Sequence, residues 1–161
     1  MAITTFKISK KLNIKYGRLR EWIDRGYIKP SKPATGQGSK SEFTLFDVYM
    51  VELFSQLLSR GFSRGVAAEN INSEIKENLH YKFGRPLYKS LIAEDVWIVF
   101  SRVRLKNDKY KVKNMVICPE LDGLYSETSS ELITNLLIEG PEDIYIVNFN
   151  RIKQKVDSAF L

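Results

Sequence analysis

The segment that most constrains the fold of this chain is residues 29–43, which reads KPSKPATGQGSKSEF. It holds two prolines, two glycines and three serines, a composition that forbids a helix and favours a hairpin. The residues on either side of it have apolar positions at helical spacing. The sequence therefore predicts a group of helices that is divided by a hairpin.

Two short helices are predicted before the hairpin. The first begins after Thr4 or Thr5, either of which can act as the N-cap, and ends before Asn13, which tolerates the left-handed conformation. The second runs from about Lys15 to Arg25 and is ended by Gly26. The apolar contacts are expected from Phe6, Ile8 and Leu12 in the first helix and from Leu19, Trp22 and Ile23 in the second.

Two further helices are predicted after the hairpin. The third begins after Thr44, where Asp47 completes a pattern typical of a capping box. It ends at Arg60–Phe62, and Ser63 caps a fourth helix that reaches about Leu79. Two helices with a tight turn, a basic hairpin and a third helix are the parts of a winged helix-turn-helix.

The pattern changes after Lys82–Pro86, which we interpret as a domain boundary. Residues 96–105 and 110–117 are rich in β-branched and aromatic residues and predict a β-hairpin. A capping box at Thr128–Glu131 opens another helix, and residues 144–149 predict another strand. A last helix has an apolar stripe that we expect to pack on the sheet of its own domain: Ile152, Val156, Ala159 and Phe160.

The predicted fold class is α+β, with two domains. Residues 1–80 form the helical winged helix-turn-helix, and residues 86–161 form a small mixed α/β domain with a β-hairpin and a C-terminal helix. We expect the second domain to supply dimerisation, effector sensing or both.

Positive charge is concentrated in the first quarter of the chain. Residues 1–40 contain ten Lys or Arg but only two acidic residues, a net charge of +8, within a chain whose net charge is +6. Localised positive charge is more typical of a nucleic-acid-binding face than of an ordinary solvated surface. The first residues of the second helix would then contact base edges in the major groove, while flanking cations neutralise phosphates.

The order of these parts resembles the mercury-resistance-regulator (MerR) family of bacterial transcription regulators. The segments that carry the resemblance are ISKKLNIKYGRLREWIDRGYIKP and GSKSEFTLFDVYMVELFSQLLSRGFSR, and the similarity covers about residues 3–78. The chain departs from the family's pattern at Gly17, Glu21 and Ser41.

The resemblance implies a role for each matching residue. Tyr16 and Arg18 stand at the start of the recognition helix and are expected to contact bases, whereas Arg20 is expected to contact phosphate. Trp22 either donates its indole N–H to a phosphate or packs in the core. The complete predicted DNA-binding set is Lys15, Tyr16, Arg18, Arg20, Trp22, Arg25, Lys32 and Lys40.

The resemblance also implies a homodimer that binds a pseudo-palindromic site in double-stranded DNA and regulates transcription in the bacterial cytoplasm, at the nucleoid. Family members generally continue into a long dimerising helix, which Gly84 and Pro86 interrupt here. Two alternatives stay open: an excisionase-like, DNA-segregation or architectural DNA-binding protein, and an effector- or protein-binding module that does not bind DNA.

Other classes of function have little support in the sequence. His80 is the one histidine and Cys118 the one cysteine, so a Cys/His zinc site cannot be assembled within one chain. We expect no enzyme activity, no metal and no cofactor, and we leave open whether a small-molecule effector binds. A single cysteine fits a reducing compartment. No apolar run reaches the ~18 residues of a membrane helix, so we expect a cytoplasmic protein without a membrane partner.

Overall fold

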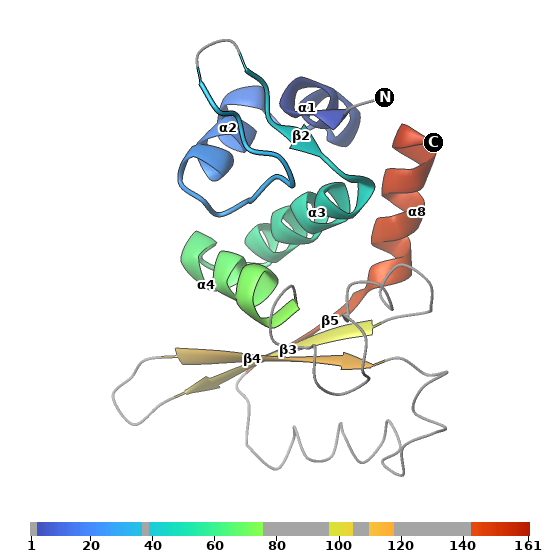
Figure 1. The fold of residues 1–161 in the computed structure, drawn as a ribbon. Helices are drawn as coiled ribbons and strands as arrows, with labels where there is room; N and C mark the ends of the chain where they lie inside the picture. The colour runs from blue at the N-terminus through green and yellow to red at the C-terminus, as the bar shows by residue number, and fades with distance from the viewer. Residues whose placement is uncertain (1–2, 37–38, 76–96, 105–109, 118–142) are drawn as a thin grey trace, which may run out of the picture.

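The computed structural model describes residues 3–36, 39–75, 97–104, 110–117 and 143–161 (Figure 1). The N-terminal elements are β1 (Ile3–Thr4), α1 (Thr5–Leu12), α2 (Tyr16–Asp24), β2 (Glu42–Phe43), α3 (Leu45–Ser59), α4 (Arg64–Glu69) and the π-helical segment η1 (Asn70–Ile75). The later elements are β3 (Trp97–Arg104), β4 (Tyr110–Ile117), β5 (Asp143–Asn148) and α8 (Phe149–Phe160). The α+β class is confirmed.

Several predicted features lie outside the described residues. They are the boundary at Lys82–Pro86, the end of the fourth helix near Leu79, the capping box at Thr128–Glu131 with its helix, and the side chains His80 and Cys118. The division into residues 1–80 and 86–161 therefore stays a prediction.

The N-terminal helices begin at the residues that local capping chemistry predicts. Thr4 Oγ1 accepts a hydrogen bond from the backbone N–H of Lys7, and Ser63 Oγ accepts one from that of Val66. Thr44 and Asp47 form a reciprocal capping box at the start of α3, with distances of 3.2 and 2.9 Å. These bonds satisfy N–H groups that have no partner within their own helix.

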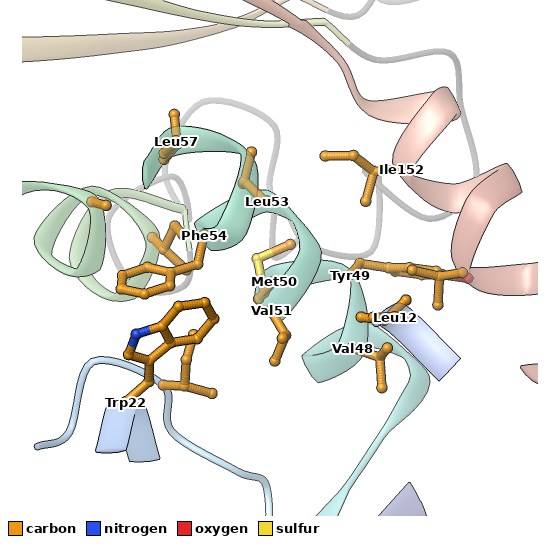
Figure 2. Packing of buried hydrophobic residues seen from close by; sticks show 14 of the residues in the cluster. Leu12, Trp22, Val48, Tyr49, Met50, Val51, Leu53, Phe54, Leu57 and Ile152 are labelled. Atoms are coloured by element: carbon orange, nitrogen blue, oxygen red, sulfur yellow. The ribbon is translucent and has the colours of Figure 1, made fainter. Parts of the chain in front are cut away.

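Helix α3 forms the centre of the core. Its buried residues lie on every side of the helix, from Val48 to Leu57, which is the pattern of a helix surrounded by other elements. On one side Phe54 meets Trp22 edge to face, with ring centroids 4.9 Å apart. On another side Tyr49 faces α8, as Figure 2 shows with Ile152 nearby.

The C-terminal sheet is antiparallel, in the order β4-β3-β5. Its β3–β4 pairing confirms the predicted hairpin, and β5 confirms the strand predicted at residues 144–149. Ile98 and Phe100 are buried, and Phe62 packs edge to face against Phe100 at 5.8 Å and against Tyr145 at 5.0 Å. The sheet therefore packs directly on the helical part.

Helix α8 corrects one expectation. The apolar stripe of this helix was expected to pack on the sheet of its own domain. Helix α8 does contact β3 of that sheet, but it also packs against α3 and α1. Tyr49 Oη donates to Asp157 Oδ1 at 2.6 Å, and Lys155 Nζ lies 2.6 Å from Glu52 Oε1. Lys7 of α1 lies 5.6 Å above the ring of Phe160. The C-terminal helix is thus part of the core beside α1 and α3 (Figure 1).

Candidate nucleic-acid interface

A tight turn after α1 sets the position of the start of α2. Asn13 adopts the left-handed conformation, with φ of 55°. The Ser9 hydroxyl donates to the carbonyl of Ile14 at 2.7 Å, and the Ile14 N–H donates back to the Ser9 carbonyl at 3.0 Å. These bonds fix the angle at which α2 leaves α1.

Helix α2 is divided into a buried side and an exposed first turn. Leu19 and Trp22 are buried, whereas Lys15, Tyr16 and Arg18 are exposed. Lys15 is the N-cap residue, and its side chain makes no capping hydrogen bond. The first turn therefore presents cations, an aromatic ring and backbone N–H groups in the pattern predicted for a recognition helix.

The predicted hairpin, residues 29–43, forms a wing that is attached at its base. Strand β2 pairs with β1 on one side, and the backbone of Glu42 bridges to Lys32 on the other. Asp47 Oδ2 accepts hydrogen bonds from the Ser31 N–H at 3.1 Å and the Ser31 hydroxyl at 2.5 Å. The carboxylate that caps α3 thus also anchors the wing.

The wing lies beside α2 at the end of the molecule opposite the β3–β5 sheet (Figure 1). A cavity of about 470 Å³ is lined by the starts of α1 and α2 and by the wing; its residues include Phe6, Tyr16, Arg20, Ser39 and Lys40. Ser39 also accepts hydrogen bonds from the N–H groups of Thr35 and Gly36, which hold the described part of the wing tip together. Helix α2 and the wing therefore form one continuous surface.

Three of the predicted cations are held in ion pairs on this surface. Arg20 pairs with Asp24 at 3.7 Å, Arg25 with Glu21 at 3.3 Å, and Lys32 with Glu42 at 3.1 Å. Exposed pairs of this kind contribute only about 0–1 kcal/mol, so a phosphate can compete for these cations.

Lys15, Arg18 and Lys40 are exposed, and within the described ranges no ion pair is formed by any of these three cations. They are therefore available to a polyanion without the loss of an internal contact.

Trp22 belongs to the core rather than to this surface. Its side chain is 2% exposed, and its Nε1 is buried with no hydrogen-bond partner among the residues that the structure describes. The indole N–H is covered in this conformation and cannot reach a phosphate. Of the two roles open for Trp22, burial supports packing against Phe54.

The contacts of two residues at the site were not predicted from the sequence. Glu21 Oε1 accepts a hydrogen bond from Arg64 at 2.8 Å, which connects α2 to the start of α4. The spacing of four residues between Glu21 and Arg25 predicts an ion pair between these two, but no local pattern predicts the contact between Glu21 and Arg64. Phe6 was expected to make apolar contacts within the fold, but its side chain is 67% exposed. It lies against Tyr16 instead, with ring centroids 6.4 Å apart.

No helix within the described ranges combines the length and the apolar content needed to cross a membrane.

No curated protein matches the chain. Residues 4–74 match the family model described as MerR HTH family regulatory protein. That range contains the turn after α1, helix α2, the wing and the capped α3 described above. The N-terminal region of this chain is therefore similar to the helix-turn-helix domain of the MerR family of regulatory proteins.

Proposed function

We propose that the protein is a transcription regulator that binds a pseudo-palindromic DNA site as a homodimer, in the cytoplasm at the nucleoid. The observation that carries the proposal is the exposed first turn of α2 beside a cationic wing, within a domain of a regulatory family. Each protomer would place α2 in the major groove of one half-site.

The side chains of the interface divide into two groups in this proposal. Tyr16 and Arg18 lie in the first turn of α2, where side chains reach base edges, and Arg can donate two hydrogen bonds to a guanine. The cations that would neutralise phosphates, on α2 and on the wing, are Lys15, Arg20, Arg25, Lys32 and Lys40. Base contacts give sequence preference, and phosphate contacts give affinity for any sequence.

Dimerisation, and any response to an effector, are assigned in this proposal to residues 86–161. The packing of α8 against α1 and α3 supports the second of these roles, because it links the C-terminal part to the N-terminal helices. A change in the C-terminal part would reach the DNA-binding helices through α8, because Tyr49–Asp157 and Glu52–Lys155 connect α8 to α3.

Selection of bound sequences from random duplex DNA tests the proposal with the full chain. We expect enrichment of one motif with two-fold symmetry, its half-sites separated by about one helical turn or a multiple of it. An enriched motif without symmetry would contradict the dimer. A chain that enriches no motif and binds no duplex would contradict DNA binding altogether.

A further inference from the structure

Phe6 and Tyr16 form an exposed aromatic pair at the start of two helices. Phe6 lies in the first turn of α1 and is 67% exposed, and Tyr16 begins α2 and is 45% exposed. Among the described side chains of residues 3–36 and 39–72, no other large apolar side chain is exposed. Their rings meet edge to face, with centroids 6.4 Å apart and planes 60° apart.

Two cations lie close to this aromatic pair. Arg20 and Lys40 line the same cavity, together with Asp24, which pairs with Arg20 at 3.7 Å, and small wing residues such as Ala34 and Ser41. An apolar protein surface placed here would have to remove Lys40, which forms no ion pair within the described ranges, from water, and this is unfavourable without an anionic partner. A duplex offers phosphates to the cations and a small apolar group to the rings, so charge complementarity favours DNA as the occupant.

The chemistry of Phe6 restricts what it can recognise. Its side chain has no hydrogen-bonding group, so it cannot pair with the polar atoms of a base edge. The C5-methyl group of thymine is the apolar group that a standard base presents in the major groove. Phe6 stands beside Tyr16, which is placed on base edges in the proposed function.

We propose that Phe6, with the edge of the Tyr16 ring, contacts the methyl group of one thymine in each half-site and thereby selects a T·A pair at that position. The inference rests on the proposed function, because it places α2 in the major groove. Phe6 would act as a specificity-determining residue that sequence analysis assigned to internal packing.

Replacement of single thymines by deoxyuridine tests this contact, because the exchange removes the methyl group and leaves base pairing intact. Duplexes that carry the selected site are titrated with wild-type protein, Phe6→Ala, Phe6→Leu and a matched control, Ile146→Ala. Ile146 is 50% exposed and lies on the sheet at the opposite end of the molecule (Figure 1).

Wild-type protein should bind about fourfold more weakly when deoxyuridine replaces one particular thymine, which is the effect expected for burial of one methyl group. Phe6→Ala should bind the two duplexes equally, and Phe6→Leu should keep part of the discrimination. Because Ile146 lies in the region assigned to dimerisation, Ile146→Ala is a control for the ratio of the two affinities: it should keep the wild-type discrimination whatever its overall affinity.

Two results would overturn this inference and leave the proposed function standing. One is specific wild-type binding whose affinity does not change when deoxyuridine replaces any thymine of the site. The other is a Phe6→Ala protein that keeps the full discrimination. If Phe6→Ala keeps the full discrimination between thymine and deoxyuridine but no longer self-associates, Phe6 belongs to a protein contact, and this result would also overturn the inference. A wild-type protein that binds no duplex would refute the proposed function, and this inference with it.

Discussion

The hydroxyl of Ser31 donates a 2.5 Å hydrogen bond to the Asp47 carboxylate, sixteen residues later in the chain. The same oxygen accepts the Ser31 and Thr44 N–H groups, and Asp47 is 4% exposed. One buried carboxylate therefore caps α3 and anchors the base of the wing. The geometry of the wing depends on the start of α3.

Replacement of Asp47 by Ala should lower the free energy of unfolding by about 1–3 kcal/mol, because the capping bonds are lost and buried donors lose their acceptor. Urea unfolding at neutral pH measures the change. Asp24→Ala is the matched control: its carboxylate is exposed and, among the residues that the structure describes, forms only the 3.7 Å pair with Arg20, so the change should stay within about 0.5 kcal/mol. Equal effects of the two substitutions would contradict the anchoring role.

Tyr49 should make stability depend on pH in the alkaline range. Burial, together with the hydrogen bond and the negative charge of Asp157, raises the pKa of Tyr49 above its ordinary value near 10. A group whose pKa is higher in the folded state contributes stability that is complete below the unfolded pKa and is lost as pH rises through the folded pKa.

The difference in unfolding free energy between wild type and Tyr49→Phe should therefore be constant below about pH 10 and shrink above it. Urea unfolding at a series of pH values measures this difference. A difference that stays constant above pH 10 would show that Tyr49 keeps an ordinary pKa in the folded protein.

Trp22 should contribute to stability but not directly to DNA binding. Trp22→Ala should cost about 3–5 kcal/mol of unfolding free energy, because it opens a cavity beside Phe54. Trp22→Phe keeps an aromatic ring in the core, and it removes the buried N–H together with part of the volume of the indole. The folded Trp22→Phe protein should therefore bind DNA with wild-type affinity in a fluorescence anisotropy titration. A tenfold loss of DNA affinity in Trp22→Phe would instead indicate that the indole N–H of Trp22 contacts a phosphate.

Arg18 and Lys40 should differ in the kind of DNA affinity that they supply. Arg18→Ala should lose about 1–3 kcal/mol on the selected site and relax the preference at one base pair. Lys40→Ala should weaken binding to all sequences alike, because a phosphate contact carries no sequence information. Titration of both variants on the selected site and on a scrambled duplex separates the two effects. Full affinity and sequence preference in Arg18→Ala would remove it from the base-contacting group.

Local signals predicted the helices and the hairpin well, because caps and strand alternation act over a few residues. Thr4, Thr44 and Ser63 cap helices as expected, and Asn13 has the left-handed conformation expected of it. The MerR resemblance, now supported by the match over residues 4–74, was visible from the same short segments.

Long-range packing could not be predicted in this way. Tyr49 and Asp157 are 108 residues apart, and no periodicity within either helix indicates that they meet. The amphipathic pattern of α8 showed that one side is buried but not against which element. The expected internal packing of Phe6 was wrong for a related reason. An apolar side chain at the start of a helix can be buried in the core or exposed to solvent, and the local sequence does not distinguish the two.

The salt dependence of DNA binding tests the central claim most directly. Five cations per protomer are assigned to phosphates, and each contact contributes about −0.9 to the slope of log affinity against log salt concentration, so a slope of about −4 to −5 per protomer is expected. Fluorescence anisotropy with the full chain and the selected duplex, from low to moderate salt, measures it. Binding that is absent at low salt, or that does not change with salt, would contradict the assignment of this surface to DNA.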